Sequence, residues 1–303
     1  MTEKKRVPAS PKTRKFAREL GVDVSLVSGT KREGRVVEDD VKRFIKEASI
    51  NKNVTEKIQF KSEYQHSEFG EIEIKDIPRI KKLAATQLTH SWNTIPHVTN
   101  HDEADVTDME NFRSSLKDLY TGEKKKITPL AFITKALVAT LKKFPTFNSS
   151  IDDIENGKMT VKKYFHIGIA VDTEHGLMVP KIRNVDQKDI NHIAEELKTT
   201  SERCRKLKID KKDFYGGSMT ITSLGGIGGS FFTPIINFPE VAILGIGKLR
   251  KVHSHSGGKP KERIMLPLSL SYDHRIINGA EAARFNNELK ENLGKNFAYR
   301  LAI

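Results

Sequence analysis

The sequence has a single cysteine, little aromatic content and no long apolar run. Cys204 is the only cysteine among 303 residues, which excludes an internal disulfide and a cysteine-based metal cluster. No run of about 18 apolar residues occurs, which excludes a transmembrane helix. No apolar segment follows the charged N-terminus, so we expect no secretory signal. These absences predict a protein of a reducing compartment with no membrane partner and no metal site, in which Cys204 is a bystander thiol.

Positive charge is in excess, with a formal net charge of +13. Such an excess is common in nucleic-acid-binding proteins. The basic residues are spread along the chain, however, and do not alternate with aromatic residues, so we expect no nucleic-acid partner. Residues 1–48 alone hold 13 Lys and Arg against 8 Asp and Glu. This segment is therefore a basic module that suits an acidic protein surface or a polyanion.

Three segments differ in their patterns. Residues 1–48 show two short amphipathic helices, at 12–20 and 38–48, joined by a polar loop. A unit this small, without a metal or a disulfide, is near the lower size limit for folding alone and usually binds a partner. Residues 49–75 are polar and lack periodicity, which predicts a flexible linker. Residues 76–303 are expected to form one large domain.

The large domain mixes helical and strand patterns without strict alternation. This predicts an α/β or α+β fold with a mixed sheet. Thr107 is expected to cap a helix, and Thr128 with Pro129 forms an N-cap and N1 pair. We expect helices at 80–91, 107–120, 129–144, 189–206 and 280–293, and strands at 164–172, 177–182, 218–222, 241–246 and 264–271.

One histidine lies where a strand pattern ends. The apolar run 264–270 leads to His274, which has Asp273 and Arg275 on either side, and an Asn-Gly pair follows. Side chains at such a strand end can face a cleft, and histidine is suited to moving protons near neutral pH. The alternative is an ordinary polar junction. A second motif, the glycine-rich 225–229, does not satisfy G-x-G-x-x-G and precedes no helical pattern, so we expect no dinucleotide-binding fold.

The basic module carries a resemblance to a known family. The stretches that carry it are Arg14–Asp23, Gly29-Thr30, Gly34-Arg35-Val36 and Asp39-Asp40-Val41. They resemble the peripheral subunit-binding domain of 2-oxo acid dehydrogenase complexes in order and in spacing. The resemblance implies that the module holds dihydrolipoamide dehydrogenase (E3) or the 2-oxo acid decarboxylase (E1). It places Arg14 and Arg35 at the contact positions, where they would otherwise be solvated surface arginines.

The large domain also carries a resemblance, in the stretches 92–99, 147–150, 167–173, 176–180, 239–245 and 273–275. These stretches resemble the dihydrolipoamide acyltransferase core of the same complexes. The resemblance implies a fold similar to chloramphenicol acetyltransferase. Several of the stretches, 95–99 among them, look most like the acetyltransferases of pyruvate dehydrogenase.

The resemblance also implies roles for individual residues. Coenzyme A or acetyl-CoA would be a substrate. His274 would take the proton from the thiol of coenzyme A, and Thr222 would donate a hydrogen bond to the oxyanion. Ser223, beside Thr222, is a substrate-binding candidate. Relatives place the hydroxyl and the histidine in neighbouring subunits of a trimer. The family usually has Asp four residues after the histidine, where this chain has Asn278. We expect activity to survive this difference, because Asn keeps the size and the hydrogen-bonding capacity of Asp. Asn278 is therefore given a structural role, and Arg275 is expected to orient the site.

Other implications concern assembly and alternatives. The trimers of the family build 24- or 60-subunit shells. No lipoyl domain or Asp-Lys-Ala hairpin is visible, and Lys135 lies in a helical pattern, so the lipoyl group must come from elsewhere. A cytoplasmic location, or the mitochondrial matrix in a eukaryote, would follow. The alternatives are a non-catalytic component that binds dihydrolipoamide dehydrogenase and assembles the complex, or an acyltransferase for succinyl or branched acyl groups.

Overall fold

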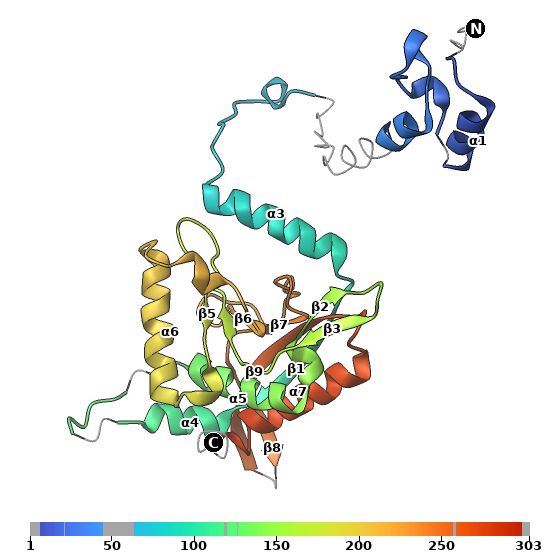
Figure 1. The fold of residues 1–303 in the computed structure, drawn as a ribbon. Coiled ribbons are helices and arrows are strands. Elements are labelled where there is room, and N and C mark those ends of the chain that lie inside the picture. Colours follow the sequence, from blue (N-terminus) through green and yellow to red (C-terminus); the bar gives the residue numbers. More distant parts are fainter. Residues whose placement is uncertain are drawn as a thin grey trace. The chain divides into compact units, whose positions relative to one another are not determined.

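The computed structural model describes residues 7–20, 22–44, 64–117, 120–125, 127–256 and 259–298. The chain divides into two compact units, Met1–Ile74 and Lys75–Ile303 (Figure 1). The positions predicted as a linker lie partly outside the described residues, because 45–63 are not among them. Each unit has its own buried core, and the two are treated separately below.

The first unit is small and helical. Ser10 caps its first helix by accepting a hydrogen bond from the Thr13 amide at 3.1 Å, and Pro11 occupies the first helical position. A second helix covers 38–44; the predicted remainder to residue 48 lies outside the described residues. The helical elements are α1 (Pro11–Glu19), η1 (Val24–Leu26), η2 (Arg32–Gly34), the helix at 38–44 and η3 (His66–Glu68).

Asp40 organises the core of the first unit. Its carboxylate is 2% exposed and accepts hydrogen bonds from the Thr30 amide and hydroxyl, from the Val37 amide and from Arg43. Burial opposes ionisation, but these donors together keep the pKa of Asp40 below its ordinary value. The loop that carries Thr30 is thus tied to the start of the second helix. The apolar residues beneath it are Ala17, Val24, Val27, Val36 and Val41.

The second unit is built on a mixed sheet, as predicted. The strand order is β1-β9-β7-β6-β4-β5, and β8 pairs with the N-terminal part of β9. Strands β4, β6 and β7 run parallel, while β5, β9, β1 and β8 join antiparallel. The strands are β1 (His97–Asp105), β4 (Ile167–Ile169), β5 (Lys181–Ile182), β6 (Met219–Ser223), β7 (Ala242–Ile246), β8 (Arg250–Ser256) and β9 (Lys259–Asp273), and a separate hairpin is formed by β2 (Ser149–Asp153) and β3 (Lys158–Val161).

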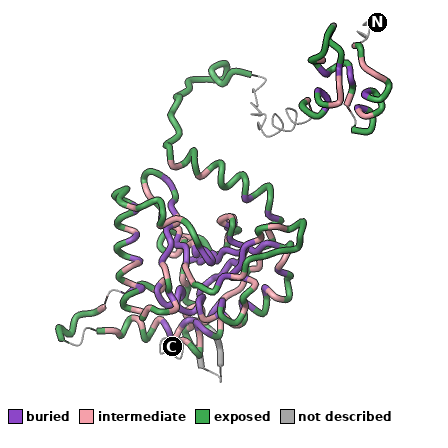
Figure 2. Tube along the Cα trace, viewed as in Figure 1, coloured by how far each residue is buried: buried purple, intermediate pink, exposed green. Residues whose placement is uncertain are grey.

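Helices pack against this sheet. Helix α5 contacts α6 and α7, α7 also contacts β1 and β9, and α6 contacts β5. Figure 2 shows that buried residues concentrate in the strands and in α5. The helices are α3 (Arg79–Thr94), α4 (Thr107–Ser115), α5 (Pro129–Lys143), η4 (Pro145–Asn148), η5 (Val185–Gln187), α6 (Ile190–Arg205), η6 (Lys211–Phe214) and α7 (Gly279–Leu293). Among the helices described, none is both long and apolar enough to cross a membrane.

The structure corrects several details of the prediction. Val106, not Thr107, is the N-cap of α4, because the Thr107 hydroxyl donates to Asp105 and accepts from the Ile264 amide. That helix ends at Ser115 rather than near 120. The predicted strands 164–172 and 177–182 shrink to β4 and β5. Thr128 is the N-cap of α5 as expected, but its side chain makes no capping hydrogen bond.

Candidate functional site

His274 lies at the C-terminal end of β9, in the turn that leads to α7. Its backbone amide donates to the Pro96 carbonyl at 3.1 Å, and the preceding amide of Asp273 donates to Val241 at 2.9 Å. On the other side the Ile277 amide donates to the Asp273 carbonyl at 3.0 Å. The main chain around His274 is therefore fixed by hydrogen bonds to two other segments and by one hydrogen bond within the turn. The residue itself is exposed, so its imidazole can meet a ligand.

The two neighbours of His274 form an ion pair beneath the turn. The Asp273 carboxylate is buried and accepts from Arg275 Nε at 2.9 Å and from Arg275 Nη2 at 2.5 Å. The Arg275 amide also donates to Asp273 at 3.0 Å. Hydrogen bonding to Asp273 raises the pKa of Arg275, against the opposing effect of burial. Arg275 is therefore engaged in holding the turn, which matches the orienting role expected for it.

Asn278 begins the helix that follows the turn. It is the N-cap of α7, and its Oδ1 accepts from the Glu281 amide at 2.9 Å. A neutral amide performs this capping as well as a carboxylate does. In a single chain the side chain thus has a structural function, since it fixes where α7 starts relative to His274.

A second histidine close to this turn is engaged at both ring nitrogens. His97 faces Asp273 across the β1–β9 pair. Its Nδ1 lies 2.7 Å from the Ile95 carbonyl, and its Nε2 accepts from the Ile236 amide at 2.9 Å. Because a carbonyl can only accept, Nδ1 must donate, and the ring is held in one neutral tautomer. His97 therefore has no ring nitrogen left to serve as a base.

Thr222 and Ser223 lie at the end of β6, and the strand registers place them far from His274. Thr222 pairs with Gly245 of β7, and Gly245 pairs with Ser269 of β9, five residues before His274. Two strand spacings and five residue rises give about 19 Å between Thr222 and His274. Within one chain the structure therefore does not bring the predicted hydroxyl and the predicted base together. Thr222 is half-buried, and the Ser223 hydroxyl accepts from the Gly225 amide at 3.3 Å.

A buried ionic network lies at the His274 end of the sheet, and the sequence did not reveal it. Lys181 Nζ and Glu240 Oε1 are 2.5 Å apart, and both side chains are 1% exposed. Glu240 Oε2 also accepts from the Thr220 hydroxyl at 2.6 Å, and Asn237 donates to Oε1 at 3.1 Å. Glu240 directly precedes Val241, the residue that anchors the Asp273 amide. The network therefore supports the strand end from which His274 projects.

Lys162 lies close to the same network. Its ammonium donates to the Gly217 carbonyl at 2.7 Å and to the Ser149 carbonyl at 3.2 Å. Burial lowers the pKa of Lys162, and the charge of Glu240 opposes this effect. Glycine is required at 217, since a Cβ there would overlap the Glu240 carboxylate. The only sequence signal was that Glu240 lies in a stretch resembling the acyltransferases; nothing indicated Lys181 as its partner.

Arg14 and Arg35 are both exposed on the first unit. Arg14 Nη2 donates to the Val7 carbonyl at 2.7 Å, which ties the N-terminal segment to α1. Arg35 pairs with Lys31 through the backbone, where the Lys31 amide donates to the Arg35 carbonyl at 3.3 Å. Both guanidinium groups belong to a surface that a partner can reach. Among the described residues, no group of three or more His, Cys, Asp or Glu side chains could hold a metal ion.

Comparison with known proteins identifies the two parts of the chain. The sequence model of the catalytic domain of 2-oxoacid dehydrogenases acyltransferases matches residues 70–299, and that of the e3 binding domain matches residues 7–42. The dihydrolipoyllysine-residue acetyltransferase component of the pyruvate dehydrogenase complex of Cupriavidus necator is 45% identical over 291 residues. That match covers 92% of this chain and 52% of the relative, so the chain spans about half the length of that protein. The component of the same name from Haemophilus influenzae is 41% identical, and the match covers 91% of this chain and 52% of the relative.

Solved structures also match this chain. The dihydrolipoamide acetyltransferase of Azotobacter vinelandii superposes with a TM-score of 0.74 at 45% identity. The match covers 78% of this chain and 96% of that chain. A second structure, the cubic core of a pyruvate dehydrogenase multienzyme complex, matches with the same TM-score, identity and coverage. The chain therefore belongs to the 2-oxoacid dehydrogenase acyltransferase family, with an e3 binding domain before its catalytic domain.

Proposed function

We propose that this chain transfers an acetyl group between dihydrolipoamide and coenzyme A, with His274 as the general base. A coenzyme A thiol becomes a strong nucleophile when it loses its proton, and an exposed imidazole on a fixed turn can accept that proton. Attack on the acetyl thioester produces a negative oxygen, which a hydroxyl donor stabilises. The names of the curated relatives favour the acetyl group over succinyl or branched acyl groups.

The spacing of three residues supports their assignment. Work on the Azotobacter vinelandii enzyme addressed the role of a serine, a histidine and an asparagine in its catalytic mechanism. That asparagine follows the histidine by four residues, as Asn278 follows His274 here, and the serine precedes the histidine by 52 residues, as Thr222 precedes His274. Asparagine after the histidine is thus shared with a studied relative. We therefore assign the oxyanion donor to Thr222 and add to Asn278 a role in the reaction alongside its capping role.

The separation of Thr222 from His274 is the observation that carries the mechanism. Two groups about 19 Å apart by strand geometry cannot act on one thioester. A ring of subunits can bring the β6 end of one chain to the β9 end of the next, because a heterologous contact joins different surfaces of identical chains. We infer a homotrimer with shared sites. The cubic core among the matching structures favours the smaller of the two expected shells.

The first unit serves assembly. Its match to the e3 binding domain supports dihydrolipoamide dehydrogenase as the partner, in preference to the decarboxylase. Arg14 and Arg35 would supply charge-assisted contacts to acidic groups of that partner. The lipoyl group would come from a lipoyl domain or a separate protein, and coenzyme A would be a substrate. A bacterial cytoplasm, or a mitochondrial matrix in a eukaryote, is the location that this role implies.

An assay of acetyl transfer from acetyl-coenzyme A to dihydrolipoamide tests the proposal. His274→Ala should lower turnover by roughly 10²–10⁴-fold, since the thiol loses its base. Thr222→Ala should cost about 10²–10³-fold. Ser223→Ala, at the neighbouring position, is the matched control and should show a smaller loss, confined to substrate binding. No turnover by assembled wild-type protein would instead favour the non-catalytic assembly component.

A further inference from the structure

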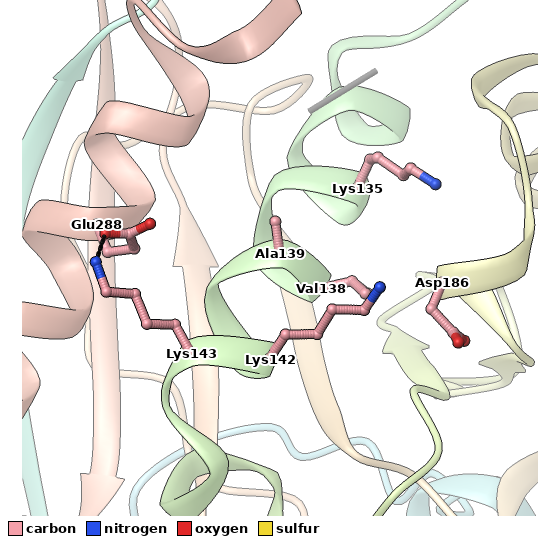
Figure 3. A pocket seen from close by; sticks show the side chains of 7 residues that line it. All are labelled: Lys135, Val138, Ala139, Lys142, Lys143, Asp186 and Glu288. Carbon is pink, nitrogen blue, oxygen red and sulfur yellow. Dashed lines mark hydrogen bonds and ion pairs between the residues drawn. The ribbon is translucent and has the colours of Figure 1, made fainter. Parts of the chain in front are cut away.

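A pocket of about 300 Å³ lies between α5, η5 and α7. Val138 and Ala139 supply its apolar wall, and its charged residues are three lysines and two carboxylates. Figure 3 shows that the three lysine side chains extend in two directions from α5. Lys143 reaches Glu288 on α7 at 2.5 Å, so that side of the pocket is neutralised. Lys135 and Lys142 extend the other way, toward η5.

Lys135 is the buried member of this cluster. It is 8% exposed, and its ammonium donates to the Lys188 carbonyl at 2.8 Å. An ammonium has three donors, and no second acceptor for Lys135 lies within hydrogen-bond distance among the described residues. Burial lowers its pKa, and the charge of Lys142 lowers it further, while Asp186 and Asp189 raise it. A buried cation with unused donors is costly unless an anion completes its contacts.

Lys142 adds a second positive charge to the same side of the pocket. It lies seven residues after Lys135, two turns along α5, so both side chains leave the same face of the helix. Its ammonium lies 5.8 Å from the centre of the Phe165 ring, and Figure 3 shows the side chain extending toward Asp186. Within the described part of the chain, no carboxylate lies within 4.0 Å of its ammonium. Among the residues that line the η5 side of the pocket, the two lysines Lys135 and Lys142 outnumber the single carboxylate of Asp186.

We propose that this pocket binds a small phosphate monoester that carries hydroxyl groups. The phosphate oxygens would accept from Lys135 and Lys142, because lysine binds phosphate as a point charge and two ammonium groups need several acceptors. Ala139, beside the largely buried Val138, offers an apolar contact to the carbon skeleton. The Asp186 carboxylate would accept from a hydroxyl group and would repel a ligand with a second anionic group on that side.

The pocket is separate from the proposed acyl-transfer site. Glu288 lies ten residues beyond Asn278 on α7, which places it about 15 Å along the helix. Binding is therefore measured by calorimetry on the full chain without turnover, so failure of either proposal leaves the other untouched. The probes are glycerol 3-phosphate, inorganic phosphate, acetate and glycerol.

Glycerol 3-phosphate should bind saturably at one site per chain, more tightly than inorganic phosphate or acetate, while glycerol should not bind. Lys142→Ala, an exposed substitution, and Lys135→Met should each weaken binding at least about tenfold, because each removes a hydrogen bond to a charged group. Lys143→Ala is the matched control at the pocket rim and should change affinity less than about twofold, since its charge is already paired.

Three outcomes would overturn the proposal. They are the absence of saturable binding of glycerol 3-phosphate, equal weakening by Lys142→Ala and Lys143→Ala, and displacement of glycerol 3-phosphate by coenzyme A. The last would assign the pocket to a coenzyme A site. Lys142→Ala should keep acetyl transfer at the wild-type rate, which shows that the variant is assembled.

Discussion

Mixing two inactive variants provides the sharpest test of a shared site. His274→Ala removes the proposed base, and Thr222→Ala removes the proposed oxyanion donor. Each variant alone should be nearly inactive. If each site takes its histidine from one subunit and its hydroxyl from the next, a trimer that contains both variants has some sites with both groups intact. If both groups came from one chain, no mixed trimer would contain an intact site.

The size of the recovery follows from the geometry. About 19 Å of sheet separates Thr222 from His274 in one chain, so every productive pair must come from two chains. In trimers assembled at random from equal amounts, half of the histidine positions and half of the hydroxyl positions are wild type. About one quarter of the sites should then be intact. Because His274→Ala alone retains at most about one hundredth of the activity, the recovered rate should exceed the residual rate by at least roughly 25-fold.

The assay is acetyl transfer after the two variants are unfolded, mixed and refolded together. A mixture of His274→Ala with the double variant His274→Ala/Thr222→Ala is the control, and it should recover nothing. Size measurement on each sample confirms that trimers have formed. Activity of the first mixture no higher than the mean of its parents, in correctly assembled trimers, would refute the shared site and the roles given to both residues.

Three further predictions concern the supports of the two units. Glu240→Ala leaves the buried ammonium of Lys181 without its carboxylate partner and should lower the free energy of unfolding, measured in urea, by about 3–5 kcal/mol. The double variant Glu240→Gln/Lys181→Met should lose clearly less stability, and equal losses would mean that the pair does not interact. The lowered pKa of Asp40 means that its stabilisation is complete above the unfolded pKa and is lost as pH falls through the folded value, which lies below 3.8. Circular dichroism of residues 1–44 should therefore show acid unfolding in that range, and Asp40→Asn should remove the pH dependence; an unchanged acid transition would contradict this. Arg14→Glu should weaken binding of dihydrolipoamide dehydrogenase at least about tenfold without changing acetyl transfer, with Arg18→Glu as the control on the same helix; equal effects of the two would indicate general charge repulsion.

Local patterns in the sequence predicted most helices, because caps and apolar periodicity are local. Thr128 and Pro129 marked the start of α5, and Asn278 with its glycine marked the start of α7. Thr107 failed as a cap because its hydroxyl bonds to Ile264, 157 residues away. The β2–β3 hairpin was missed because β2 is polar except for Ile151 and its buried residues, Ser149 and Ser150, are adjacent, so no apolar alternation marks the strand.

The candidate site was predicted in its residue types but not in its geometry. His274 could be selected from its place after an apolar strand, and the family resemblance indicated Thr222. Their separation depends on the order β9-β7-β6, which is set by pairing between distant segments and has no local signal. The pair Lys181–Glu240 is hidden for the same reason, since 59 residues separate the two partners. A buried charge with a fixed partner cannot be distinguished by sequence from an exposed one.

The two ends of the sheet differ in a way that fits the proposed shared site. At the β9 end, the ion pair of Asp273 with Arg275 and the buried Lys181–Glu240 pair fix the turn, while His274 stays exposed. At the β6 end, Thr222 and Ser223 lie at the strand terminus. In the proposed mechanism, each end supplies only one of the two groups that the reaction needs. The proposed shared site links catalysis to association, so the specific activity of this chain should fall on dilution as trimers dissociate, in proportion to the fraction of chains that lose a neighbour.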